Sequence, residues 1–152
     1  MEILVDIATF YYMAPVLFIL GACIGSFFNV IIYRFPLGKS IVFPDSACPH
    51  CKTKIAPYDN IPILSWFILM GKCRNCKAPI SPLYMVNETI YGTIAMIPSF
   101  IYPQWWIGLP LSGALLALGP TLYLLVRHKR APWYLILASV GLGALYAVQL
   151  LG

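Results

Sequence analysis

Two cysteine pairs with the same spacing restrict how the middle of this chain can fold. Cys48-Pro-His-Cys51 and Cys73-Arg-Asn-Cys76 are both C-x2-C motifs, and the 21 residues 52–72 separate them. A two-residue gap lets one tight turn present two sulfurs to one ion, and zinc accepts four thiolates in a tetrahedral shell. The spacing therefore predicts a structural zinc site at these four cysteines. Two disulfides are the alternative, and they require an oxidising compartment.

Outside this segment the chain is too apolar for a water-soluble domain. Hydrophobic residues make up 61% of its 152 residues and charged residues 10%, and the mean hydropathy is +0.82. One domain of this length cannot bury so much apolar surface, so a lipid bilayer has to accept the remainder. The expected fold class is an all-α integral membrane protein.

Long uncharged stretches predict about four transmembrane helices, because a bilayer span needs about 20 apolar residues. They run over about 7–33, from 82 to 97 or 102, 109–126 and 132–151. Ser81 and Pro82 supply a helix start for the second span, and Pro98 is expected to bend it. Residues 103–106 are interpreted as an interfacial turn. The first span is expected to be retained, since acidic residues stand where a cleaved signal peptide carries Lys or Arg.

The hydrophilic segment 34–81 is expected to form a small zinc-stapled loop between the first two spans. Prolines at 36, 44, 49, 57, 62 and 79 leave no room for a long helix. Its middle, residues 61–70, is too short to span a bilayer and too apolar to leave in water. We expect this stretch at the membrane interface with Trp66 at headgroup depth. A buried strand or helical turn of the loop itself is the alternative.

The placement of positive charge predicts the orientation. All ten Lys and Arg residues lie in 34–77 or 127–130. With four spans, both basic segments fall on one side of the membrane, and the positive-inside bias makes that side cytoplasmic. Both termini then face outward. Thiols stay reduced in a cytoplasmic loop, which favours zinc over disulfides. The formal net charge of +5 then needs no nucleic-acid partner.

Two stripes of small or polar residues are candidates for helix–helix contact, because small side chains let a second helix approach closely. Each has i+4 spacing: Gly21, Gly25 and Asn29 in the first span, and Ser139, Gly143 and Ala147 in the last. The side chain of Asn29 is expected to hydrogen-bond either a partner helix or the backbone of a substrate.

Short motifs occur in a fixed order on both sides of the cysteines. They are Gly25-Ser-Phe-Phe-Asn-Val30, Arg34-Phe-Pro36, Asp59-Asn-Ile-Pro-Ile-Leu-Ser-Trp66, Gly71-Lys-Cys-Arg-Asn-Cys76, Pro79-Ile-Ser81, and Tyr84 with Glu88. Together they resemble the N-terminal region of the type IV prepilin peptidase family over about residues 21–92. The resemblance divides the chain in two. Residues 1–92 hold the first span, the loop with the cysteines and the start of the second span, and residues 93–152 hold the remaining spans.

The resemblance implies a multi-pass protein of the bacterial inner membrane that acts on the N-terminal segments of type IV prepilins or type II secretion pseudopilins. Members of the family cut a short leader after a glycine and then methylate the new N-terminal amine, with S-adenosylmethionine as methyl donor. The cysteine-bearing cytoplasmic loop is associated with the methylating half. Two aspartates, the second in a G-x-G-D motif, carry the cutting half.

This sequence departs from the family pattern in the cutting half. Its acidic residues are Glu2, Asp6, Asp45, Asp59 and Glu88. Aspartyl proteolysis needs two carboxylates close enough to share a proton, and Asp45 and Asp59 belong to the loop of the methylating half. We therefore expect no leader cleavage by this chain alone. A separate aspartyl peptidase subunit is a candidate partner.

Glu88 is the candidate catalytic residue for methyl transfer. A carboxylate at membrane depth is costly and is usually functional or paired. It is expected to hold the ammonium of the substrate and to help deprotonate it; an ion pair with Arg34 or a loop lysine is the alternative. The candidates for substrate binding are Asn29, Arg34, Asp59 and Asn60. For three of them a simpler role is the alternative: a membrane-edge anchor for Arg34, and a turn for Asp59 and Asn60.

Three functions remain open from the sequence. The first is a short or truncated member of the prepilin peptidase family that retains the methylation-associated region and its structural zinc, and that as an enzyme is an S-adenosylmethionine-dependent N-methyltransferase. The second is a non-catalytic membrane zinc protein that docks pilins or a separate peptidase subunit through the Gly21/Gly25 and Ser139/Gly143 faces. In the third, the basic segments contact nucleic acid or lipid; the even spread of charge disfavours it.

Overall fold

Four long helices make up most of the residues that the structure describes. The computed structural model describes residues 2–102 and 105–151, and it describes side chains from residue 12 onward except at 99, 105 and 106. The long helices are α1 (Glu2–Arg34), α3 (Leu83–Ile101), α4 (Trp105–His128) and α5 (Trp133–Leu151). Between α1 and α3 lie the short helices η1 (Phe35–Leu37), η2 (Pro57–Asp59) and α2 (Leu64–Ile68). The all-helical prediction and the absence of a long helix in the proline-rich loop are confirmed.

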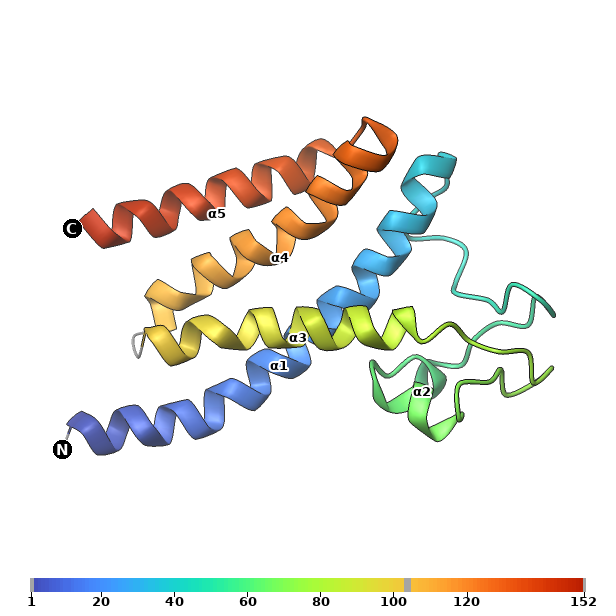
Figure 1. Ribbon diagram of the computed structural model, residues 1–152, viewed down its shortest axis with the longest axis horizontal. Coiled ribbons are helices and arrows are strands. Elements are labelled where there is room, and N and C mark those ends of the chain that lie inside the picture. Colours follow the sequence, from blue (N-terminus) through green and yellow to red (C-terminus); the bar gives the residue numbers. More distant parts are fainter. Residues whose placement is uncertain (1, 103–104, 152) are drawn as a thin grey trace.

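The helices run back and forth along one axis, so that the two ends of the molecule differ (Figure 1). α1 leads to the cysteine loop (residues 34–81), α3 returns from it, and α4 and α5 form an antiparallel pair. Both chain termini lie at the end away from the cysteine loop (Figure 1). Of the interfacial turn expected at 103–106, residues 103 and 104 lie outside the described residues, and Trp105 opens α4.

Within residues 2–102 and 105–151, three segments are long and apolar enough to cross a membrane. They are Tyr12–Leu37, Ile107–His128 and Trp133–Leu151. α3, the second of the four expected spans, is not among them; its first half carries Asn87, Glu88 and Thr89. The structure therefore supports three of the four expected spans by length and composition.

α1 and α3 approach closely at glycines. A Cβ added at Gly21 would lie 2.5 Å from the Cβ of Ala95 and 2.6 Å from the carbonyl oxygen of Tyr91, and one at Gly25 would lie 2.7 Å from the Cβ of Tyr91. The stripe in α1 is thus a helix-contact face, but α3 of the same chain already covers it. The hypothesis that Gly21 and Gly25 dock an external partner is wrong for this reason.

A cluster of buried side chains joins the helices near the cysteine loop. It comprises Phe28, Ile31, Ala95, Leu116, Leu124 and Leu135. Phe35 and Ile41, from the first part of the loop, pack against it, as does Tyr134 at the start of α5. Burial of these apolar groups therefore anchors the start of the loop to the helix ends.

Candidate metal centre and the adjoining carboxylate

The two cysteine pairs adopt the same backbone fold. In the first knuckle, residues 47–54, Cys48 N–H donates to Thr53 O at 3.0 Å and Lys52 N–H donates to Cys48 O at 2.9 Å. In the second knuckle, residues 72–79, Cys73 N–H donates to Ala78 O at 2.8 Å and Lys77 N–H donates to Cys73 O at 3.0 Å. An antiparallel bridge closes each one, Ala47 with Lys54 and Lys72 with Pro79. The repeated C-x2-C sequence thus produces a repeated structure.

A lysine follows the second cysteine of each knuckle and turns the chain back. Lys52 has φ 61° and Lys77 has φ 60°, in the left-handed region that side chains other than glycine rarely adopt. The shared backbone geometry requires this conformation, since the next residues must return to close the bridge. As a result each pair of cysteines projects toward the other pair.

The four sulfurs form a cluster of the size that zinc requires. The Sγ atoms of Cys48, Cys51, Cys73 and Cys76 all lie within 4.8 Å of one another, and those of Cys48 and Cys76 are 3.8 Å apart. A tetrahedron with Zn–S bonds of about 2.3 Å has edges of about 3.8 Å. The four residues fit a tetrathiolate metal site, and four thiolates would leave no open coordination position for substrate. Cys23, the fifth cysteine, is not in this group.

Hydrogen bonds around the cluster prepare two of the sulfurs to be thiolates. The side-chain hydroxyl and backbone N–H of Thr53 lower the pKa of Cys51 to about 5, with a smaller contribution from Asn75. Asn75 Nδ2 also donates to Thr53 Oγ1 at 2.9 Å, which orients that hydroxyl. The backbone N–H groups of Cys76 and Asn75 lower the pKa of Cys73.

The sulfur of Cys76 shows the repulsion among the four clustered sulfurs. The backbone N–H of Ala78 lowers the pKa of Cys76, but desolvation and the three neighbouring sulfurs outweigh it and raise the pKa to about 11. Four thiolates at this separation repel one another strongly. A bound divalent cation reverses this balance, because it stabilises every coordinating thiolate.

An ion pair ties the η2 turn to the second knuckle. Arg74 Nε and Nη2 donate to Asp59 at 2.8 Å and 2.6 Å, and the guanidinium lies 5.6 Å from the centre of the Tyr58 ring. The Arg74 hydrogen bonds lower the pKa of Asp59. Both carboxylate oxygens of Asp59 are used within the loop, and the Asn60 backbone N–H closes η2 on Pro57 O at 3.1 Å. Asp59 and Asn60 do form the expected turn; a substrate role for them stays a prediction.

The apolar segment 61–70 forms α2 and packs against the second knuckle. Ser65 Oγ donates to Tyr58 O at 3.1 Å, and Trp66 Nε1 donates to Ile80 O at 3.2 Å. The Trp66 ring lies over Gly71, where an added Cβ would come within 2.9 Å of it and where φ is +64°. Several apolar side chains remain exposed, namely Leu64, Phe67, Ile68 and Met70. The helical-turn alternative is therefore observed, and the membrane depth of Trp66 stays a prediction.

Glu88 lies at the junction of the loop with α3. It is only 8% exposed, and its Oε2 accepts a hydrogen bond from the backbone N–H of Ile63 at 2.8 Å. Arg34, the alternative partner, donates from Nη1 to Ser40 O at 3.1 Å instead. In the part of the chain that the structure describes, the ion pairs are Lys54–Asp45 and Arg74–Asp59, so this buried carboxylate has no cationic partner there.

Asn29 bonds to a neighbouring helix of its own chain. Its Oδ1 accepts a hydrogen bond from Asn87 Nδ2 of α3 at 2.9 Å. Its Nδ2 is buried and has no hydrogen-bond partner among the described residues. The structure therefore places Asn29 at the contact of α1 with α3 and Glu88 at the contact of the loop with α3, whereas Asp59 and Asn60 lie in the loop.

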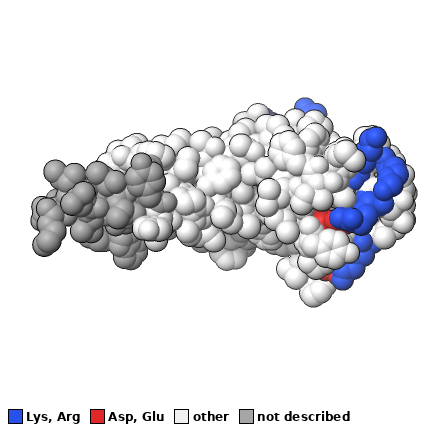
Figure 2. Space-filling model, turned by 90° about the horizontal axis from the view of Figure 1, so that it is seen from below, with Lys and Arg blue, Asp and Glu red and all other residues white. Residues whose placement is uncertain are grey.

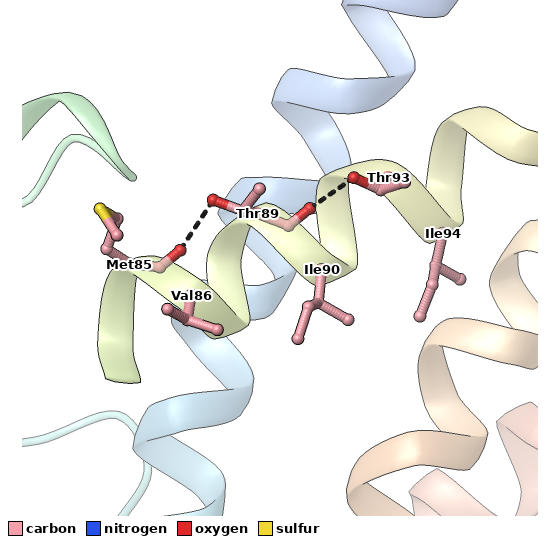
Figure 3. Close-up of a pocket in the computed structure, with 6 residues that line it drawn as sticks. All are labelled: Met85, Val86, Thr89, Ile90, Thr93 and Ile94. Carbon is pink, nitrogen blue, oxygen red and sulfur yellow. Dashed lines mark hydrogen bonds between the residues drawn. The ribbon is translucent and has the colours of Figure 1, made fainter. Parts of the chain in front are cut away.

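A shallow apolar groove runs along another face of α3. The groove has a volume of about 370 Å³. Its lining residues are Met85, Val86, Thr89, Ile90, Thr93 and Ile94 (Figure 3). Thr89 and Thr93 donate to carbonyl oxygens one turn earlier in the same helix, each at 2.9 Å. These residues recur at helical spacing and exclude Glu88, so the groove and the carboxylate occupy different faces of α3.

Two features of the junction were missed from the sequence. The positive φ of Ile63 has no sequence signal, because β-branched residues avoid that region. The stacking of Trp66 on Gly71 could have been suspected from a glycine that follows an apolar segment directly.

The helices and the cysteine cluster define a helical protein of membrane type with a loop suited to a metal ion. The family model described as "Bacterial Peptidase A24 N-terminal domain" matches residues 19–102. The chain belongs to this family, and the resemblance to prepilin peptidases is confirmed.

Its curated relatives are longer proteins. The prepilin leader peptidase/N-methyltransferase of Myxococcus xanthus is 51% identical over 81 residues, covering 53% of this chain and 24% of the relative. That of Klebsiella pneumoniae is 40% identical, covering 71% and 49%. That of Stutzerimonas stutzeri is 32% identical, covering 82% and 51%. The chain thus spans between a quarter and about half the length of these relatives. No solved structure matches it.

Proposed function

We propose that this chain performs the methylation-associated work of the prepilin peptidase family on the N-termini of type IV pilin-like or type II secretion pseudopilin subunits. The observation that carries the proposal is the buried carboxylate of Glu88, which has no cationic partner among the described residues and lies where the cysteine loop meets the helices. An N-terminal ammonium would supply the missing charge.

The proposed reaction needs a free amine as nucleophile. Glu88 would hold the substrate ammonium and accept its proton, and the amine nitrogen would then attack the methyl carbon as the carbon–sulfur bond breaks. S-adenosylmethionine supplies that methyl group as the second substrate. Zinc, held by the four cysteines, would fix the shape of the loop and take no part in the reaction. The sequence has no acidic residue after Glu88, so leader cleavage is not proposed.

The proposed location is the bacterial inner membrane, with the cysteine loop in the cytoplasm and both termini outside. Lys and Arg gather at one end of the molecule (Figure 2), which supports that orientation through the positive-inside bias. The orientation also requires α3 to cross the membrane as a fourth span. Its 19 residues would rise about 28 Å, close to the thickness of a hydrocarbon core, and α3 packs along α1.

A methyl-transfer assay tests the proposal. The purified protein is incubated with a pre-cleaved pilin peptide and labelled S-adenosylmethionine. Transfer is expected with the wild-type protein, and Glu88→Gln should lower it at least about 100-fold, since a positioned general base contributes about 10²–10⁴-fold. Thr89→Ala, one residue away on the groove face, is the matched control and should retain activity. Equal transfer by Glu88→Gln and wild type would contradict the assignment.

A docking protein without catalysis is the second candidate. α5 favours it, because a Cβ added at Gly143 of the Ser139/Gly143/Ala147 stripe would meet no atom within 4 Å, so this position is open to another helix. A pilin or a separate aspartyl peptidase subunit is the proposed occupant. Absence of methyl transfer by zinc-loaded protein, together with capture of one of these partners that Gly143→Leu abolishes, would favour docking over catalysis.

A further inference from the structure

The loop segment that meets Glu88 has an unusual backbone conformation. Ile63 has φ 64° and ψ −58°, and Leu64 N–H donates to Pro62 O at 2.6 Å across it. This is a γ-turn of the positive-φ kind, which is rare and strained. Isoleucine is poorly suited to it, since a β-branched side chain at positive φ is an outlier. Such a conformation persists only where the surroundings hold it in place.

Glu88 is the group that holds this turn. The N–H of Ile63 donates to Glu88 Oε2 at 2.8 Å, and its orientation relative to α2 depends on the positive φ. With Glu88 removed, that N–H would lose its acceptor at a partly buried junction, which is an unfavourable state for a backbone donor. The strained turn and the carboxylate of α3 therefore depend on each other.

The turn continues directly into the packing of the metal centre. Ile63 precedes α2, whose Ser65 and Trp66 bond to Tyr58 O and Ile80 O. The Trp66 ring covers Gly71, two residues before Cys73. A shift of α2 would thus reach the second knuckle through the contacts of Trp66 with Ile80 and Gly71.

We propose that Glu88 is a positioning residue that latches the cysteine loop onto α3 by holding the Ile63 turn. The latch uses Oε2 of Glu88, which accepts the hydrogen bond from the Ile63 N–H. A carboxylate can accept hydrogen bonds on both oxygens, so Oε1 is left to accept the substrate ammonium. The role of Oε1 rests on the proposed function. The latch needs an acceptor oxygen at position 88, whereas the ammonium needs the negative charge.

Substitutions at positions 88 and 63 separate the two roles. The zinc-loaded full chain in detergent is challenged with a chelator, and amide exchange is followed over residues 61–70. Glu88→Ala should speed exchange and zinc loss by about 10-fold to 100-fold, the range for losing a hydrogen bond to a charged acceptor. Glu88→Gln keeps an acceptor and should stay within about threefold of the wild type. Thr89→Ala is the control and should behave as the wild type.

Ile63→Gly tests the strain directly. Glycine adopts positive φ without steric cost, so the turn should persist without help. In the Ile63→Gly background, Glu88→Ala should speed exchange less than it does with Ile63, because the lost acceptor still costs free energy but the turn is no longer strained. Equal effects of Glu88→Ala in both backgrounds would overturn the latch, as would Glu88→Gln behaving like Glu88→Ala. If Glu88→Ala does not fold, Glu88→Gln decides the matter through the same two readouts: rates within about threefold of the wild type support the latch, and a larger change overturns it.

The outcome is separable from that of the proposed function. Glu88→Gln with a slow, wild-type rate of zinc loss but no methyl transfer supports both roles. Glu88→Gln with both properties intact keeps the latch and removes the ammonium role.

Discussion

The cysteine loop and the seam between α1 and α3 are held together by different interactions. The loop leaves many apolar side chains exposed, and specific polar contacts and four clustered sulfurs shape it. The seam contains glycines at which an added Cβ would clash with backbone or side-chain atoms of the other helix. Polar contacts and clustered thiols thus shape one region, whereas shape complementarity determines the other. A change in one region should therefore leave the other largely intact, except through Glu88.

The largest expected effect comes from a cysteine of the metal centre. Cys73→Ser should lose bound zinc and expose the loop, because zinc binding contributes on the order of 10 kcal/mol to the folding of small zinc-binding modules. Zinc content per chain and trypsin cleavage at the loop lysines measure this, while the helical circular dichroism should stay unchanged. Cys23→Ser is the control. Full zinc retention by Cys73→Ser would remove the distinction between the two regions.

A substitution at Gly21 tests the seam between α1 and α3 in place of the loop. Gly21→Leu should destabilise the helix bundle by about 1–3 kcal/mol, since overpacking forces the helices apart, and it should leave zinc bound. Unfolding in mixed detergent measures the loss. Gly143→Leu adds the same side chain at a position where an added Cβ would meet no atom within 4 Å. This variant should therefore leave the stability of the helix bundle nearly unchanged. A similar loss in both variants would argue against close packing at Gly21.

The smallest effect is expected at the ion pair of Asp59 with Arg74. Asp59→Asn should speed amide exchange of residues 57–60 by about fivefold or less, because the Arg74 side chain of the pair is open to solvent and such pairs contribute little. The Asp59 pKa is lowered in the folded protein, so its contribution is complete above the unfolded pKa of about 3.9 and is lost as the pH falls through the lower folded pKa. Amide exchange between pH 5 and 8 should therefore show a constant difference between the variant and wild type. A difference that shrinks within that window would contradict the assignment.

The parts that the sequence predicted correctly depend on local rules. Helix positions follow from apolar length, and each knuckle follows from contacts within about five residues of its first cysteine, as between Cys48 and Thr53. The Ile63–Glu88 bond joins residues 25 positions apart, and the strained turn that makes it possible runs against residue preference. The sequence also marked Gly21 as a contact site but could not identify α3 as the partner, since small-residue stripes do not specify what they meet.

The metal content of the wild-type protein tests the four-cysteine assignment most directly. Protein purified in detergent without added metal should contain about one zinc per chain, and its four loop thiols should react with a thiol reagent only after a chelator is added. Zinc-free protein in which the loop cysteines form two disulfides would contradict the assignment.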